Sequence, residues 1–467
     1  MNPLKMKFLG ASPQDIVLKT TTSRCTVCRN PVPAEVVKSA RNGREQIFMR
    51  RECPSHGKQE FVIASDARFY WLAKGNPANS GCCCGTSCAS AGAGKPGFLG
   101  SNALDAAKRG TIERLSTCVA LIELVDSCNM ACPTCYAGSP VGAAGPQLKY
   151  HSFDDVTSRI QGVLERKGHI DIIQFSGGEP TLHPEFFRLV EWVRSNPGIG
   201  YLVINTNGIR LAKDEAFMER LGEQFRRFED IQIYLQFDGP QEAGQVKLRA
   251  ADMRKTRERA IINCGSSGLP VTLAMTVNQE NLGYVWDSVE YARRFEHVRG
   301  LSFQPEFLSG RSPSPRAGQG LPQPITPADI ILGLNSQSEG LVALDDFTPL
   351  PCGDPNCATI GWLFRMGDKY YSPTTHGIDI PALQAKMPDR IHYRLEDLVK
   401  CGCDGTALGE LMKRLELKES HAMRLFIKPF MDERTWDEDR IDRCCTHVIR
   451  PDGKLDSFCR YYSSLPV

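Results

Sequence analysis

Strand-like and helix-like segments alternate between residues 118 and 310. Six short apolar runs rich in β-branched residues read as strands, and they lie at 119–125, 170–176, 201–207, 231–238, 271–277 and 301–307. Amphipathic helical segments lie between them, at 152–166, 184–195, 213–227, 250–264 and 283–295. This alternation predicts parallel βα units, and six of them predict an α/β fold with a partial (β/α)6 TIM-like barrel. In such a barrel we expect the catalytic site to lie at the carboxyl ends of the strands.

The flanking segments differ from this region in composition. Residues 1–117 contain CTVC, ECPSHG and the stretch NSGCCCGTSCASAGAGKPGFLGS, which has little helix or strand potential. Residues 311–467 open with RSPSPRAGQGLPQP and contain several more cysteines. We therefore expect an N-terminal cysteine-rich metal-binding domain (1–117), the partial barrel (118–310) and a C-terminal auxiliary cluster domain (311–467).

Composition and charge narrow the function classes. The 467 residues are 24% charged and 41% hydrophobic with a net charge of +2, which argues against a disordered chain and against nucleic-acid binding. The apolar runs fall far short of the roughly 20 residues needed to span a bilayer. The N-terminus has no convincing secretory signal. We expect a cytoplasmic protein that could contact the inner membrane face peripherally.

The 19 cysteines indicate metal ligation, because a chain of this size does not need disulfides and a reducing cytosol disfavours them. Directly after the first predicted barrel strand, the CxxxCxxC spacing of DSCNMACPTCYAGS is formed by Cys128, Cys132 and Cys135. Three thiolates can hold a [4Fe–4S] cluster and leave one iron open to a substrate or cofactor. The alternative is a zinc site that lacks its fourth ligand.

The next two predicted strands end in SGGEPTL and INTNG. Together with CxxxCxxC, these motifs resemble those of the radical S-adenosylmethionine (SAM) enzymes. The resemblance implies that the open iron chelates SAM and that one electron cleaves it to a 5′-deoxyadenosyl radical, which abstracts hydrogen from unactivated carbon. The residues that it places around SAM are Gly177, Gly178, Glu179, Asn205 and Asn207. Polar residues at other strand ends could contact SAM or substrate, or only cap helices; these are Gln236, Asp238, Thr276 and Gln304.

A second metal site is predicted near the N-terminus. A CxxC pair followed by CxxH, the spacing of a zinc knuckle, is formed by Cys25, Cys28, Cys53 and His56. A structural zinc is one interpretation. The other is a rubredoxin-like iron, held by the thiolates of Cys25, Cys28 and Cys53 and by a fourth thiolate from Cys82 or Cys83.

The remaining cysteines predict auxiliary iron–sulfur sites. One [4Fe–4S] cluster would use Cys84, Cys88, Cys118 and the spare one of Cys82 and Cys83. A further cluster, with one thiol to spare, could use Cys352, Cys357, Cys444, Cys445 and Cys459. Cys401 and Cys403 could serve another site or none, and Cys264 is expected to be a buried thiol. A cluster with four cysteine ligands would relay electrons, whereas an open iron could bind substrate.

The order of motifs over nearly the whole chain is similar to that of the archaeal tetraether lipid synthases, a group that also contains proteins assigned as pterin methyltransferases. The shared motifs are CxxC, CPxHG, CPxCYA, YLQFDG, PCGDPNC and CCxHxxxPDGxxxxFC. The resemblance implies a radical SAM core with several extra iron sites. The expected cofactors are SAM, its [4Fe–4S] cluster, one or two auxiliary [4Fe–4S] clusters and one mononuclear Fe or Zn.

We consider three functions, of which the first two are implied by this resemblance. The first, which we expect, is formation of sp³ C–C bonds between lipid chains, with aliphatic and aromatic residues lining the barrel: Leu235, Phe237, Leu273, Met275 and Phe303. The alternative is radical methylation of a pterin or similar small molecule, with a compact polar pocket and a folate-type carbon donor. Both need a reductant such as ferredoxin or flavodoxin. The third, a non-catalytic electron carrier, has no need of the GGEP motif.

Overall fold

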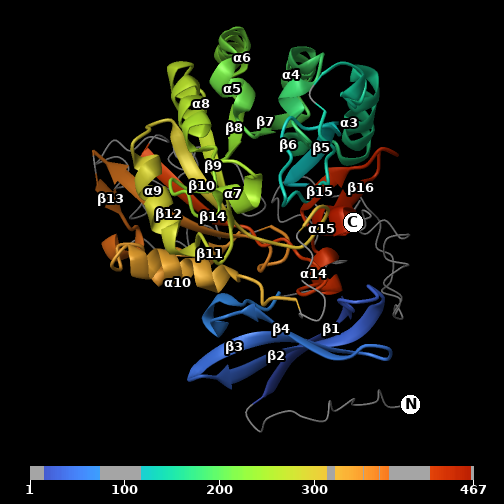
Figure 1. Cartoon of the computed structure of the whole chain (residues 1–467), viewed down its shortest axis with the longest axis vertical. Coiled ribbons are helices and arrows are strands. Elements are labelled where there is room, and N and C mark those ends of the chain that lie inside the picture. The colour runs from blue at the N-terminus through green and yellow to red at the C-terminus, as the bar shows by residue number, and fades with distance from the viewer. Residues whose placement is uncertain are drawn as a thin grey trace, which may run out of the picture.

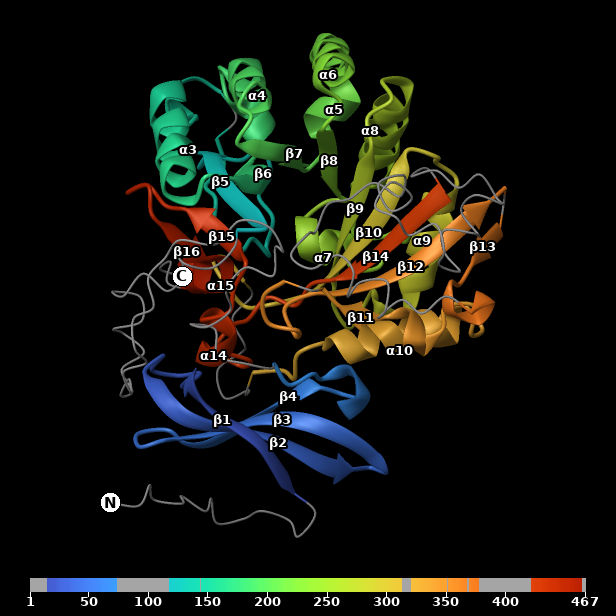
Figure 2. The ribbon, with the colours of Figure 1, turned by 180° about the vertical axis from the view of Figure 1, so that it is seen from behind.

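The computed structural model describes residues 15–73, 117–142, 144–312, 321–350, 352–367, 369–377 and 421–463. Within these residues the chain forms a small antiparallel sheet and a large mixed sheet (Figures 1 and 2). The small sheet lies beside α10 and α14, at the opposite end of the molecule from the outer ends of helices α4, α6 and α8.

The N-terminal sheet contains four antiparallel strands in chain order: β1 (Ile16–Arg24), β2 (Pro31–Arg41), β3 (Arg44–Cys53) and β4 (Gly57–Ala64). The turn between β2 and β3 is Asn42–Gly43, and both residues have positive φ angles, of 51° and 75°. This is the turn chemistry that a tight two-residue hairpin requires. A small cluster of buried side chains on one face includes Val36, Ile47 and Met49.

Six parallel strands, paired in chain order, form the centre of the large sheet, as predicted. They are β5 (Val119–Val125), β6 (Ile170–Gly177), β7 (Ile199–Thr206), β8 (Ile231–Gln236), β9 (Val271–Val277) and β10 (Val298–Pro305). The helices are α3 (Phe153–Lys167), α4 (Phe186–Arg194), α5 (Ile209–Lys213), α6 (Glu215–Phe228), α7 (Gln245–Arg249), α8 (Arg254–Ser266), α9 (Val285–Arg293) and α10 (Pro327–Gln337). The expected α/β barrel fold is confirmed.

Strands from the C-terminal third extend this barrel on both edges. β14 (Ala422–Ile427) pairs in parallel with β10, and β15 (Thr446–Ile449) pairs in parallel with β5. Antiparallel strands then follow: β12 (Thr359–Met366), β11 (Thr348–Pro349), β13 (Lys369–Tyr371) and β16 (Leu455–Ser457). The short helices α14 (Glu438–Ile441) and α15 (Phe458–Ser463) flank β15 and β16 along the chain. The C-terminal third, expected to be a domain of its own, thus shares one sheet with the barrel.

The barrel strands present opposite faces to the helices and to the interior. In β8, Ile231, Ile233 and Leu235 are buried in the main hydrophobic core, whereas Gln232 and Tyr234 lie on the other face. The prediction that aliphatic and aromatic residues of these strands line the inside of the barrel is wrong for the residues named. All of them belong to the main hydrophobic core: Leu235, Phe237, Leu273, Met275 and Phe303. Side chains alternate along a strand, and a one-residue error in register exchanges the two faces. No helix within the described ranges has the length and apolar character needed to cross a bilayer.

Candidate functional site

The CxxxCxxC loop after β5 lies at the carboxyl ends of the barrel strands. A cavity of about 120 Å³, here called the loop cavity, contains this loop and the ends of β6 to β10. Its lining includes Cys128, Cys132, Cys135, Gly177, Gly178, Glu179, Asn205, Asn207, Gln236, Arg249, Thr276 and Gln304. Most residues that the sequence placed around SAM therefore meet in one cavity.

Backbone amides of the GGE motif hold the cysteine loop against the end of β6. Gly178 N donates to Val125 O at 2.6 Å, and Glu179 N donates to Ser127 O at 3.2 Å. A Cβ atom at Gly178 would lie only 2.0 Å from Ser127 O. A Cβ at Gly177, where φ is +110°, would lie 2.3 Å from Val125 O. The glycines are therefore required for close approach of backbone to backbone, which positions Cys128.

Glu179 is buried, with 2% of its surface exposed, and its carboxylate is surrounded by donors. Oε1 accepts bonds from Thr181 Oγ1 at 2.6 Å and Thr206 Oγ1 at 2.7 Å, and Oε2 accepts from Asn207 N at 2.8 Å. Burial raises the pKa of Glu179, and these hydrogen bonds oppose that rise. Oε2 keeps acceptor capacity for a further donor, such as an ammonium group.

Two other predicted contacts have partners within the protein. Asn207 Nδ2 donates to Asn129 Oδ1 at 2.7 Å, and Asn207 Oδ1 accepts from Ile209 N at 3.0 Å at the start of α5. Asn205 Nδ2 lies 3.5 Å from Ser176 Oγ. Asn205 lines the loop cavity, whereas Asn207 both lines it and fixes the loop before α5.

Asp238, predicted as a cofactor contact, instead lies in a buried ion-pair network and is not among the residues that line the loop cavity. Its Oδ2 accepts from Arg249 Nε at 2.7 Å and lies 3.2 Å from Arg257 Nη1. Its Oδ1 accepts from Arg249 Nη2 at 3.0 Å and from Gln236 Nε2 at 2.8 Å. Asp238 thus orients Arg249, and Arg249 lines the loop cavity.

The donor set suits a three-thiolate cluster. Burial raises the pKa of Cys128 to about 12 and also raises that of Cys132, so these thiols favour the neutral form unless a cation stabilises the thiolate. Arg249 lies beside Cys132 and opposes that rise. The described residues that line the loop cavity include no fourth cysteine. A [4Fe–4S] cluster held there would keep one open iron.

A second cavity, of about 200 Å³, occupies the inside of the barrel and is here called the barrel cavity. Inward-facing residues of β6 to β10 form one wall, in which Ile172, Val203 and Ala274 lie among nine polar residues: Gln174, Tyr201, Asn205, Gln232, Tyr234, Gln236, Thr272, Ser302 and Gln304. Apolar and aromatic residues from β5, β14 and the C-terminal segment form another: Val119, Leu121, Phe426, Phe430 and Phe458. The two cavities share Tyr136, Asn205, Gln236 and Gln304, so they adjoin.

Thiols gather at the barrel cavity, whose lining includes Cys352, Cys357, Cys444, Cys445 and Cys459. The sulfur atoms of Cys118, Cys352 and Cys445 lie within 4.8 Å of one another, and Cys445 Sγ is 3.4 Å from Cys352 Sγ. Cys118 was predicted to pair with the cysteines at 82–88. The structure places it instead with the C-terminal set, because Cys118 immediately precedes β5 and Cys445 immediately precedes the paired strand β15.

Six other cysteines lie outside the described residues: Cys82, Cys83, Cys84, Cys88, Cys401 and Cys403. Cys264 is fully buried in the main hydrophobic core, as expected for a structural thiol. Burial raises the pKa of its thiol to about 12.

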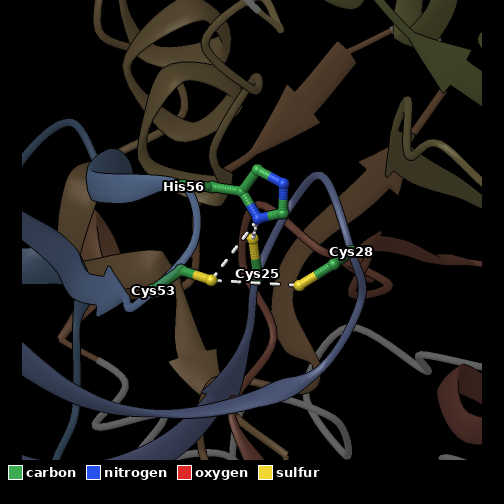
Figure 3. Close-up of side chains that lie close together, drawn as sticks. All are labelled: Cys25, Cys28, Cys53 and His56. Atoms are coloured by element: carbon green, nitrogen blue, oxygen red, sulfur yellow. Dashed lines mark hydrogen bonds between the residues drawn. The ribbon is translucent and has the colours of Figure 1, made fainter.

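The N-terminal cysteine group forms a compact site at one end of the small sheet (Figure 3). His56 Nδ1 lies 3.6 Å from Cys25 Sγ and 3.5 Å from Cys53 Sγ, and Cys28 Sγ lies 3.9 Å from Cys53 Sγ. A tetrahedral zinc with typical bond lengths would separate S and N by about 3.6 Å and two S atoms by about 3.8 Å. The four side chains therefore have the spacing of a Cys₃His zinc site, without a thiolate from residues 82 or 83.

Hydrogen bonds prepare Cys25 for metal binding. Although burial opposes ionisation, bonds from the backbone amides of Cys28 and Val27 and from Gln59 lower the pKa of the Cys25 thiol to about 6. The thiolate, which is the form that binds a metal, is therefore favoured at neutral pH.

Models of two known families match the segments that contain the cysteine loop and the N-terminal Cys₃His group. The model of the radical SAM superfamily matches residues 122–292, which contain the cysteine loop and β6 to β9. The chain contains a radical SAM domain. The model of the HMPTM N-terminal zinc ribbon domain matches residues 17–65, which include β1 to β4 and the Cys₃His site.

Curated relatives of this radical SAM enzyme include the 7,8-dihydro-6-hydroxymethylpterin dimethyltransferase of Methanocaldococcus jannaschii, which is 25% identical over 95% of this chain and 93% of its own length. The PqqA peptide cyclase of Gluconobacter oxydans is 30% identical over 37% of this chain and 45% of its own length. Among solved structures, Streptococcus suis SuiB bound to S-adenosylmethionine has 12% identity and a TM-score of 0.37, covering 50% of each chain.

Sequence patterns alone missed two features of this radical SAM enzyme. Arg249 ends a five-residue helix, and no motif marks it as a cavity residue. The polar lining of the barrel had a signal in the sequence, because IQIYLQ in β8 alternates Ile and Leu with Gln232, Tyr234 and Gln236. That period-2 alternation identifies the inward face.

Proposed function

We propose that this radical SAM enzyme methylates a pterin or a similar small, flat heterocycle. The polar inward face of the barrel cavity carries this proposal. It bears four glutamines and an asparagine, whose amides offer both donors and acceptors to the edge of a nitrogen heterocycle. The likeness over 95% of the chain to a protein named as a pterin dimethyltransferase supports the same substrate class.

The alternative of joining lipid chains receives less support. A hydrocarbon chain in the barrel cavity would offer no donor to the side-chain carbonyl oxygens of Gln236 and Gln304, whose amide nitrogens already have partners, and leaving a buried polar group unpaired costs roughly 1–3 kcal/mol. The volume of about 200 Å³ is somewhat larger than the ~150 Å³ cavity known to hold benzene, which suits a compact bicyclic ring. Aromatic residues such as Phe430 and Phe458 offer a face for a planar ligand.

Two glutamines occupy the boundary between the proposed substrate and cofactor sites. Gln304 Nε2 donates to Tyr234 OH at 2.7 Å, and Gln236 Nε2 donates to Asp238 Oδ1 at 2.8 Å. Both bonds use the amide nitrogen, so the carbonyl oxygens remain as acceptors for a ligand. We place SAM in the loop cavity, where Glu179 Oε2 would accept from its amino group. When bound and reduced, the cluster and SAM supply the 5′-deoxyadenosyl radical.

The thiols at the barrel cavity are proposed to hold an auxiliary iron–sulfur site. Burial is the main cause that raises the pKa of Cys357, and Cys445 together with burial raises the pKa of Cys352. The charge of Lys428 in the same cavity opposes both rises only in part. A bound metal cation would therefore be needed to stabilise the thiolates. The N-terminal Cys₃His site would hold a structural metal, zinc by its geometry. The reaction also requires a carbon donor, which is SAM itself or a second cofactor, and a reductant such as ferredoxin or flavodoxin in the cytoplasm.

The experiment is an anaerobic reaction of iron-reconstituted protein with SAM, a strong reductant and a reduced pterin, analysed by mass spectrometry. Formation of 5′-deoxyadenosine together with a pterin that gains one CH₂ supports the proposal. SAM labelled with ¹³C in its methyl group reports whether SAM supplies the carbon. A parallel reaction with a total lipid extract that loses two hydrogens per new bond, while the pterin stays unchanged, would overturn it.

A matched pair of variants tests the site itself. Gln304→Leu removes an amide that lines both cavities, whereas Gln161→Leu makes the same change on the exposed surface of α3. We expect Gln304→Leu to raise the pterin KM about tenfold or more, the effect of leaving a buried ligand edge unpaired. Equal KM values for both variants would contradict the proposed site.

A further inference from the structure

The N-terminal sheet is bound tightly to the segment that precedes the C-terminal cysteines. Lys19 forms an ion pair with Asp437 at 2.8 Å, and Ser23 Oγ donates to Trp436 O at 2.6 Å. The Arg24 guanidinium lies over the Trp436 ring at 3.6 Å from its centroid. Trp436 is fully buried. These contacts join β1 to residues more than 400 positions later in the chain.

Arg51 is the centre of this contact, with only 1% of its surface exposed. Its Nη1 donates to Ser23 Oγ at 2.5 Å, and its Nη2 donates to Arg434 O at 3.1 Å. Its Nε donates to Gln59 Oε1 at 3.2 Å, and Gln59 Nε2 in turn donates to Cys25 Sγ at 3.3 Å. A continuous set of hydrogen bonds, partly buried at Gln59 and fully buried from Arg51 onward, thus leads from Cys25 of the N-terminal site to the backbone of Arg434.

The side chain of Arg434 continues this path to the wall of the loop cavity. It forms a buried ion pair with Asp432 at 2.6 Å, and its Nη2 donates to Glu306 O at 3.3 Å. Asp432 Oδ2 accepts from Leu308 N at 2.8 Å. Glu306 and Phe307 line the loop cavity directly after β10. Asp432 and Arg434, which do not line the loop cavity, therefore hold the segment 306–308 in place through hydrogen bonds to its backbone.

We propose that the N-terminal metal site positions this wall of the SAM cavity, and that Arg51 and Arg434 are positioning residues for SAM. With metal bound, Cys25 and Gln59 fix Arg51, and Arg51 fixes Arg434. Loss of the metal would release Gln59 from Cys25 and allow the wall to move. SAM affinity would then depend on a metal site that touches neither SAM nor its cluster. The inference requires a radical SAM site and does not depend on the identity of the substrate.

The test measures the SAM Kd of the cluster-loaded protein by anaerobic equilibrium dialysis and the hydrogen exchange of peptides that contain residues 306–308. Arg51→Met removes the central donor. Arg50→Met is the matched control, because Arg50 directly precedes Arg51 in β3 and forms ion pairs with Asp15 and Glu60 instead. We expect Arg51→Met to raise the Kd about tenfold and to increase exchange at 306–308, with no such change in Arg50→Met.

A double-mutant cycle tests whether the metal acts through Arg51. Cys28→Ser removes one ligand of the N-terminal site, and metal analysis reports the loss of that metal while cluster iron is retained. The Kd of the double variant should equal that of either single variant, because both break the same path. Multiplicative effects, or an unchanged Kd in Arg51→Met, would overturn the inference. If Arg51→Met fails to fold, Gln59→Met breaks the link to Cys25 without removing a buried charge, and an unchanged Kd there would be equally decisive.

Discussion

Asp238 is a buried carboxylate that neutralises two buried guanidinium groups, and its removal is the sharpest test of the network beside the loop cavity. Asp238 is fully buried, Arg249 contacts it at 2.7 Å and Arg257 at 3.2 Å. Its φ angle is +62°, a value that asparagine tolerates better than most residues. Asp238→Asn therefore removes the charge while keeping the shape and the backbone conformation.

Breaking a buried ion pair by removing one partner costs about 3–5 kcal/mol. For a folding unit of the size of the barrel, each kcal/mol lowers Tm by roughly 2–4 °C, so we expect a fall of at least about 6 °C. Burial alone would raise the pKa of Asp238, but Arg249 and Arg257 hold it below its usual range. The folded-state pKa is lowered, so this stability is complete above the unfolded pKa of about 3.9 and lost only as pH falls through the folded value. The loss in Asp238→Asn should therefore be equal at about pH 6 and about pH 8.

Differential scanning calorimetry under anaerobic conditions measures this effect. Asp252→Asn is the control, because Asp252 pairs with Arg254 at 2.8 Å on the surface, where side chains are 40% and 36% exposed. An exposed pair of this kind contributes at most about 1 kcal/mol. A Tm for Asp238→Asn as close to wild type as that of Asp252→Asn would refute the argument that the two arginines depend on this carboxylate.

Three further predictions concern the glycine motif, a buried thiol and the N-terminal metal. Gly178→Ala should abolish retention of the cluster, measured as iron per chain, because its Cβ would collide with Ser127 O, whereas Gly283→Ala, which meets nothing within 4 Å, should retain full iron. Cys264 should resist alkylation at pH 8 until the protein is unfolded, since burial raises its thiol pKa to about 12; alkylation of Cys264 in the folded protein would contradict its placement. His56→Ala should weaken binding of one metal equivalent by at least about tenfold without changing cluster iron, as measured by competition with a chelator.

The sequence was sufficient to predict the barrel, because its strands and helices have strong and different periodicities. The cysteine loop, GGE and INTNG motifs each follow a predicted strand, and parallel strands bring their carboxyl ends together. The Cys₃His group was predictable for a similar reason, since its ligands are local pairs joined by a hairpin. Local patterns of this kind can be recognised in a sequence even when the pairing of distant strands is unknown.

Long-range features were not predictable in the same way. The association of Cys118 with Cys445 depends on the pairing of β5 with β15, which no local pattern specifies. The lining of the barrel was assigned to the wrong face because hydrophobicity marks burial and not direction. Both faces of a barrel strand are enclosed, and here the more apolar face packs against helices. Asp238 was misassigned because Arg249 and Arg257, which neutralise it, belong to the two helices that follow and no local pattern links them to this carboxylate.

The extension of the barrel by β14 and β15 affects how the chain can fold during synthesis. Until these strands emerge from the ribosome, β5 and β10 both present unpaired backbone edges, which are templates for association with other chains. Synthesis proceeds at about 5–20 residues per second, so the barrel waits for several seconds with both edges open. A chain that terminates before β14 would keep the unpaired edges of β5 and β10 permanently. We therefore expect C-terminally truncated chains to be recovered in aggregates.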